Sequence, residues 1–141
     1  MKKIVSLFVL FAAIVLTGCS SNGGYNFDEA NDLVKKIESN EEFTQDDYSK
    51  AISLMKSATE YAFDLIADVD FSDKEAAAKK MTEIADAKES KEIDATNTKI
   101  TTYVYMHRSD LDEANTKALE DVEKYATERA KELQEKMLGA N

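Results

Sequence analysis

Proline is absent from this 141-residue chain, and glycine occurs only at positions 18, 23, 24 and 139. The stretch between the last two of these glycines therefore lacks both of the residues that most strongly interrupt helices. Its commonest residues, Ala, Lys and Glu, favour helix. We expect an all-α fold, a small bundle of about four helices, occupying residues 26–141.

The first two helices have the clearest predicted boundaries. Asn26 can cap a helix that ends at Ser39-Asn40, and Thr44 can cap a second one with Asp47 in the capping-box position. The second helix should run to about Val69 and carries two adjacent apolar stripes, so we place it at the centre of the bundle. The stripes are Tyr48, Ile52, Met55, Thr59, Ala62, Ile66 and Val69, and Leu54, Ala58, Tyr61 and Leu65.

Two later helices are also predicted from their caps. Ser72 with Glu75 has the form of a capping box, and the helix that follows should end near Ser90. Ser109 is the expected cap of a last helix from about Asp110 to residue 138.

The stretch 94–107 is ambiguous. Its threonines and tyrosines, with Val104, favour a strand by propensity. A lone strand would leave its backbone groups unpaired, because no second strand is predicted. As a helix, Ile100, Tyr103, Val104, His107 and Leu111 would share one face, so we predict helix.

The amino terminus has the form of a secretory signal. Lys2 and Lys3 precede thirteen residues, 4–16, of which only Ser6 is polar. A spanning helix needs about 20 apolar residues, so this run is too short to cross a membrane. Its exit, Leu16-Thr17-Gly18-Cys19, resembles the lipobox of bacterial lipoproteins, although the lipobox more often has Ala or Ser where Thr17 stands. The alternatives are an ordinary cleaved signal followed by a coincidental cysteine, and an apolar helix that is not cleaved.

The resemblance implies a lipid anchor and a processed chain. Residues 1–18 would be removed, the Cys19 thiol would receive a diacylglyceryl group, and the new amino terminus would often be acylated as well. Residues 19–25 would form a short flexible tether below the bundle. By resemblance to sorting in diderm bacteria, Ser20 in place of Asp favours the outer membrane over the inner one.

The charge of the chain limits its partners. The formal net charge is −10, and removal of Lys2 and Lys3 with the signal leaves −12. Nucleic acid is excluded, since its phosphates need Lys and Arg. Anionic headgroups repel such a chain, so the membrane must hold it through the acylated cysteine alone. Solvation is the simplest reason for the acidity.

Several kinds of site are disfavoured. One histidine and one cysteine leave almost no soft ligands, so we predict neither a metal site nor a cofactor. His107 lies on a largely apolar face and is expected to be packed and hydrogen-bonded. The segment from Asp68 resembles the start of a calcium loop, but Asp73 and Lys79 occupy the positions that require glycine and glutamate.

Three functions stay open. Phe63 lies outside both apolar stripes of its helix. One helix face cannot bury both Tyr103 and Tyr105. We therefore predict that Phe63 and Tyr105 mark a contact patch for a protein partner. The simpler interpretation is that the tyrosine rings pack along the surface with their hydroxyls in water.

A module binding a cation or an apolar molecule between helices is the alternative function. Enzymatic activity is not expected, with no catalytic residue assigned, although Asp64 and Asp68 lie one turn apart.

Overall fold

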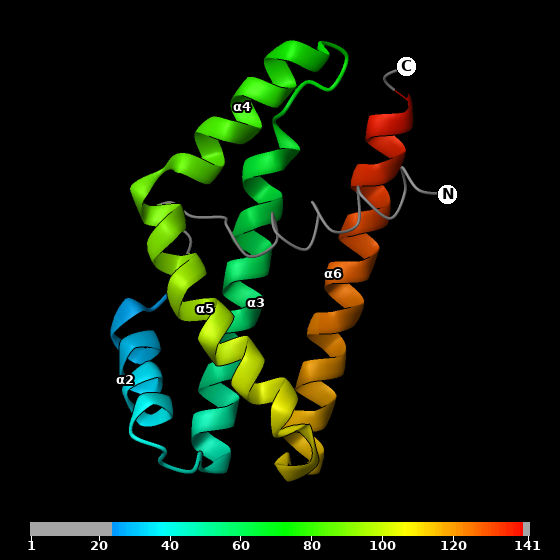
Figure 1. Cartoon of the computed structure of the whole chain (residues 1–141). Coiled ribbons are helices and arrows are strands. Elements are labelled where there is room, and N and C mark those ends of the chain that lie inside the picture. Colours follow the sequence, from blue (N-terminus) through cyan, green and yellow to red (C-terminus); the bar gives the residue numbers. More distant parts are fainter. Residues whose placement is uncertain (1–23, 140–141) are drawn as a thin grey trace.

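The computed structural model describes residues 24–139 (Figure 1). The predicted signal peptide, Cys19 and all but the end of the tether lie outside this range. Within it the chain forms α2 (Phe27–Glu38), α3 (Gln45–Ala67), α4 (Lys74–Asp86), α5 (Lys88–Met106), the 3₁₀ turn η1 (Arg108–Asp110) and α6 (Glu113–Gly139). The all-α prediction is confirmed. The described range holds five α-helices, one more than the estimate of about four, because the ambiguous stretch belongs to a full helix, α5.

The caps of α2 and α3 are those predicted. Asn26 Oδ1 accepts a hydrogen bond from the Glu29 N–H at 3.2 Å. Thr44 and Asp47 form the complete box: the Asp47 N–H donates to Thr44 Oγ1 at 3.2 Å, and the Thr44 N–H donates to Asp47 Oδ2 at 2.9 Å. These two caps could be predicted from the sequence because each bonds to a backbone group only three residues away.

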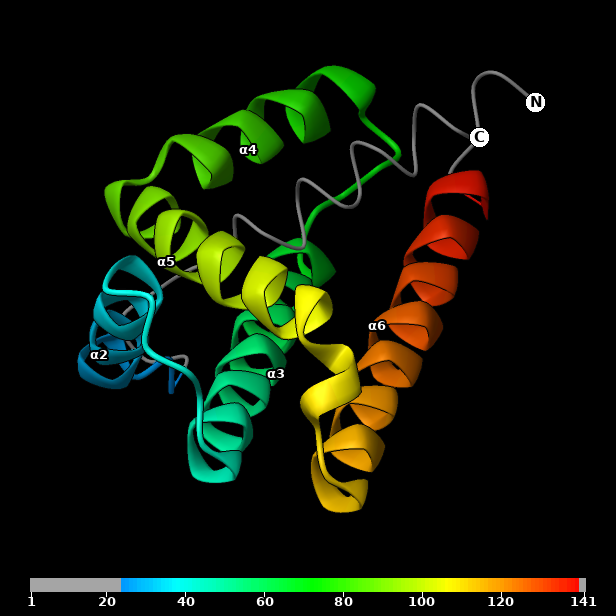
Figure 2. The same cartoon turned by 60° about the horizontal axis from the view of Figure 1, so that its bottom comes forward.

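The helix α3 is the centre of the fold, as predicted. It packs against α2, α5 and α6, and both views of the chain place α2 and α6 on opposite sides of it (Figures 1 and 2). All residues of its first predicted stripe are buried, and those of the second are buried except Leu65, which is half-buried. The largest core cluster joins α3 to its three neighbours through side chains that include Leu33, Ile52, Leu54, Met55, Ile100, Val104 and Leu119.

The start of α4 differs from the prediction by one residue. Asp73, and not Ser72, is the N-cap: its carboxylate accepts from the N–H groups of Glu75 and Ala76 at 3.1 and 3.0 Å. Ser72 is committed to the preceding turn, since both its N–H and its hydroxyl donate to Asp70 Oδ1. Ser72 and Asp73 are both residues that can cap a helix. Because Ser72 is bonded within the preceding turn, Asp73 caps α4.

The break between α4 and α5 comes earlier than the expected end near Ser90. Ala87 has extended backbone, with a ψ of 134°. Ser90 is fully buried, and its hydroxyl donates to the Ile84 carbonyl oxygen at 2.7 Å. That side chain therefore satisfies a carbonyl which the interrupted helix would otherwise leave without a partner.

The helical prediction for 94–107 is confirmed. Ile93, Ile100 and Val104 lie on one face of α5 and are each at most 2% exposed. This face packs against α2 and α3. Burial at helical spacing therefore outweighs the strand propensity of the threonines and tyrosines.

The predicted start of the last helix is wrong. Arg108–Asp110 forms the turn η1, and α6 begins only at Glu113. Asp112, and not Ser109, takes the capping role, because its Oδ1 accepts from the Asn115 N–H at 2.8 Å.

The described helices offer no membrane span. None of those between residues 24 and 139 combines the length with the apolar character that crossing a bilayer requires.

Candidate functional site

Tyr25 fixes the point at which the chain enters the helical domain. Its hydroxyl hydrogen-bonds to the Thr96 hydroxyl on α5 at 2.9 Å. Its ring meets the Phe27 ring edge-on, with 5.2 Å between the centroids. Tyr25 also packs against two core clusters. The folded domain therefore begins at Tyr25, at the α2–α5 side.

Tyr105 lies on the surface, as the sequence analysis anticipated. Its side chain stands near the carboxyl end of α5 and is 42% exposed. The hydroxyl donates to Glu123 Oε1 on α6 at 3.0 Å. Burial of the phenol and, after it, the bond to the anionic Glu123 raise the pKa of Tyr105 to about 12. The ring is thus held in place while much of it stays open to solvent.

Tyr105 belongs to a larger group that joins α5, η1 and α6. The Arg108 guanidinium forms a two-pronged ion pair with Glu123, at 2.8 and 3.1 Å, and lies 5.9 Å from the centre of the Tyr105 ring. Met106 follows directly and is 77% exposed, a large value for an apolar side chain. We call these four residues, Tyr105, Met106, Arg108 and Glu123, the Tyr105 surface.

Phe63 does not lie on the surface, so the sequence analysis was wrong about its exposure. Its side chain is only 4% exposed. One of its contacts is the Tyr125 ring of α6, edge-on at 6.5 Å between centroids. Since α3 has neighbours on several sides, a residue outside the two predicted stripes can still be buried. Phe63 and Tyr105 therefore do not share one exposed patch.

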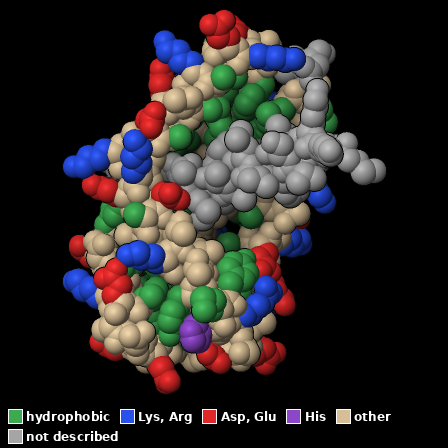
Figure 3. All heavy atoms as spheres, viewed as in Figure 1, with side chains coloured by type: hydrophobic (Ala, Val, Ile, Leu, Met, Phe, Trp, Pro, Cys, Tyr) green, Lys and Arg blue, Asp and Glu red, His purple; other side chains and the backbone are tan. Residues whose placement is uncertain are grey.

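An aromatic group stands beside the Tyr105 surface. The rings of Phe43 and His107 lie 4.3 and 4.2 Å from that of Tyr103, centroid to centroid, and Tyr48 is next to them. His107 Nδ1 is 3.1 Å from Asp110 Oδ2. The prediction of a packed, hydrogen-bonded histidine is confirmed. Figure 3 shows hydrophobic side chains gathered around the histidine, drawn in purple.

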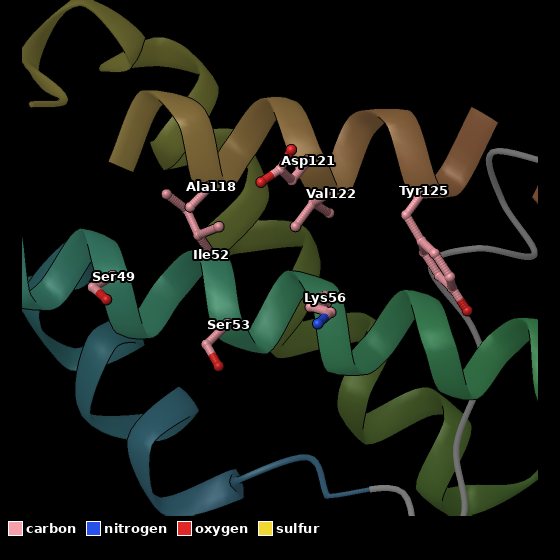
Figure 4. A pocket seen from close by; sticks show the side chains of 8 residues that line it. All are labelled: Ser49, Ile52, Ser53, Lys56, Ala118, Asp121, Val122 and Tyr125. Atoms are coloured by element: carbon pink, nitrogen blue, oxygen red, sulfur yellow. The ribbon is translucent and has the colours of Figure 1, made fainter. Parts of the chain in front are cut away.

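A cleft of about 470 Å³ runs between α3 and α6 (Figure 4). Both apolar and polar side chains line it, and Tyr125 stands at one end. The lining includes one cation, Lys56, whose Nζ is 3.6 Å from Glu60 Oε1, and one carboxylate, Asp121. Sequence patterns did not single out this cleft, because it depends on how two helices pack. The lining residues are Ser49, Ile52, Ser53, Lys56, Ala118, Asp121, Val122 and Tyr125.

The described helices show neither a cluster of metal ligands nor a buried pair of carboxylates at Asp64 and Asp68. Across the part of the chain that the structure describes, no three His, Cys, Asp or Glu side chains gather as a metal site would require. Asp64 and Asp68 are both exposed at the carboxyl end of α3. Solvated carboxylates on a helix surface explain them without a catalytic role.

The comparisons with known proteins bear on the amino terminus. Residues 1–20 match the family model of the prokaryotic membrane lipoprotein lipid attachment site. This finding confirms the resemblance of Leu16–Cys19 to a lipobox and indicates a membrane-anchored lipoprotein of the cell envelope. The chain matches no curated protein and no solved structure.

Proposed function

We propose that this lipoprotein is an interaction module: an acylated Cys19 holds it on the membrane, and its helical domain binds a protein partner in the envelope. The observation that carries the proposal is the exposure of Tyr105 and Met106 side by side at the end of α5. Tyr, Met and Arg are enriched in protein interfaces, and the Tyr105 surface contains one of each.

The Tyr105 surface is suited to binding because it is already ordered. Glu123 holds both the Tyr105 hydroxyl and the Arg108 guanidinium. A partner that covers the ring therefore does not have to immobilise it, which lowers the entropic cost of association. Met106 adds an adaptable apolar side chain beside this rigid ring.

Photo-crosslinking in intact cells tests the partner. A photoreactive amino acid would replace Met106 in the full chain, and Thr82, an exposed residue of α4, would be the matched control position. We expect a discrete protein adduct at position 106 and none at 82. Tyr105→Ser should reduce the adduct about tenfold, equivalent to ~1.4 kcal/mol of binding free energy. Equal labelling at both positions, or an adduct indifferent to Tyr105→Ser, would contradict the proposal.

A small-ligand module is the second candidate, and the α3–α6 cleft favours it. Its volume falls within the range of ligand pockets, about 300–1,000 Å³. A bound ligand at a hundredfold excess over its Kd should stabilise the domain by about 2.7 kcal/mol. A thermal-shift screen with cations and small apolar compounds distinguishes the two functions, with Ser53→Trp, which obstructs the cleft, as the control. A pure partner-binder gives no such shift.

The lipid attachment is proposed at the Cys19 sulfur, with palmitate-type acyl chains and a location at the outer membrane. The family match at residues 1–20 supports the anchor, and Cys19 is the single cysteine of the chain. Cys19→Ala should release the protein from the membrane fraction. Ser20→Asp should shift it toward the inner membrane. A free thiol in the mass spectrum of the purified protein would refute the attachment.

A further inference from the structure

The start of the folded domain lies close to the proposed lipid. Only six peptide bonds separate Cys19 from Tyr25. At about 3.3 Å per residue the intervening chain reaches roughly 20 Å at most. The helix α6, with 27 residues, is about 40 Å long at 1.5 Å per residue. The tether is therefore too short to let the domain turn freely above its anchor.

The Tyr25 contacts decide which side of the domain stays near the anchor. The hydrogen bond to Thr96 and the ring contact with Phe27 hold Tyr25 against α5 and α2. The helix α6 lies across α3 from α2 in both views of the molecule (Figures 1 and 2). A bilayer within reach of Cys19 is consequently nearer to α2 and the amino-terminal half of α5 than to α6.

The charge of this side is compatible with a lipid surface. The helix α2 and residues 88–97, the amino-terminal half of α5, contain seven acidic residues and four lysines, a net charge of −3, whereas the mature chain carries −12. Lys36 of α2 is paired with Asp47 of α3, at 2.8 Å. Most of the charge that an anionic surface would repel lies on other parts of the domain.

We propose that the side formed by α2 and the amino-terminal half of α5 faces the phospholipid headgroups, and that α6 faces away from them. The proposal rests on the lipid anchor given under the proposed function. It places the Tyr105 surface, which is bonded to α6 through Glu123, on the side open to the envelope space. The short tether and the Tyr25 contacts impose this orientation.

Fluorescence quenching in vesicles tests the orientation. The acylated protein has no free native thiol, so one introduced cysteine can be labelled selectively. Lys35→Cys on α2 and Lys124→Cys on α6 form a matched pair, because their side chains are 75% and 74% exposed and each lies in a surface ion pair. In vesicles containing headgroup-spin-labelled lipid, we expect the label at position 35 to be quenched at least twofold more than that at 124.

The controls separate this inference from the anchor. If the labelled protein does not sediment with the vesicles, the anchor fails and the orientation fails with it. If it sediments but the two labels are quenched equally, or position 124 is quenched more, the orientation alone is overturned. Forty Gly/Ser residues inserted before Tyr25 have a mean span of about 35 Å, and they should abolish the difference. A difference that persists with this linker would refute the role of the tether.

Discussion

The Asn115 side-chain amide donates to two oxygens of Gln45, the backbone oxygen at 3.0 Å and the side-chain oxygen at 2.9 Å. The Gln45 side chain also donates to the Asp110 carbonyl oxygen and accepts from the Asp112 N–H. The first residue of α3 thus holds the end of the connection between α5 and α6. This connection places Arg108 next to Glu123, so the Tyr105 surface depends on it.

Replacement of Asn115 by Ala should destabilise the domain. Asn115 is 6% exposed, and its loss removes both of the hydrogen bonds by which its amide ties α6 to Gln45 of α3. We expect the free energy of unfolding to fall by about 1–3 kcal/mol, measured by urea denaturation. Lys117→Ala, at an exposed position one turn from the connection, should change it by less than about 0.5 kcal/mol. Equal effects of the two substitutions would contradict this role of Asn115.

Asp47 should make the stability of the domain sensitive to acid. Burial opposes its ionisation, but hydrogen bonds from Lys36 and from the Thr44 backbone and hydroxyl outweigh it and lower the Asp47 pKa below 3.8. A lowered folded-state pKa contributes stability that is complete above the unfolded-chain value and is lost as the pH falls through the folded value. Asp47→Asn should therefore cost about 1–3 kcal/mol at neutral pH and progressively less below pH 3.8.

Asp46→Asn is the matched control for this acid effect. The neighbouring carboxylate is 74% exposed and pairs with Lys50 on the surface. Exposed pairs of this kind contribute about 0–1 kcal/mol. A pH profile for Asp47→Asn that runs parallel to that of the parent protein would show that the buried carboxylate is not the titrating group.

The sequence predicted those boundaries that depend on one local signal. Asn26 and Thr44 were identified as caps because each bonds to an N–H three residues on. The prediction of Ser72 and Ser109 as caps was wrong, because a second capping residue lies close to each, Asp73 and Asp112 respectively. Ser72 is bonded within a turn, which leaves Asp73 as the cap of α4. The segment before α6 is held by Gln45, which is 67 residues away from Asp112 in the chain. Contacts of that range leave no local pattern in a sequence.

The candidate site was predictable to a similar extent. The lipobox is a contiguous motif, so it could be recognised from four residues. Tyr105 and Phe63 were both surplus aromatics by helical spacing, yet only Tyr105 is exposed. Burial of Phe63 and the cleft between α3 and α6 depend on where α6 crosses α3, which periodicity within one helix does not specify.

The register of α6 gives a direct test of its packing. Leu119 is fully buried in the main core cluster, whereas Ala114, five residues before it on the same helix, is exposed. Leu119→Ala should therefore cost about 2–5 kcal/mol of unfolding free energy. Ala114→Gln should cost less than about 0.5 kcal/mol. The opposite ranking in chemical denaturation would mean that α6 presents a different face to α3.

The Tyr105 hydroxyl should titrate late, and Glu123 should be part of the reason. Burial and the bond to Glu123 raise the Tyr105 pKa from 10.0 to about 12. Because the folded-state pKa is the higher one, this stabilising contribution is complete below pH 10 and is lost as the pH rises toward 12. The tyrosinate absorbance of the parent protein minus that of Tyr105→Phe isolates this residue among the six tyrosines.

The same titration in a Glu123→Gln background should give a lower Tyr105 pKa, because the nearby negative charge is gone. Glu128→Gln, on an exposed part of α6, should leave it where it was. An unchanged Tyr105 pKa in Glu123→Gln would mean that the hydroxyl is not bonded to α6, and the ring would then lack the order that suits it to a partner. Tyr105→Phe keeps the ring and removes only the hydroxyl, so its crosslinking yield at Met106 measures how much binding depends on that order.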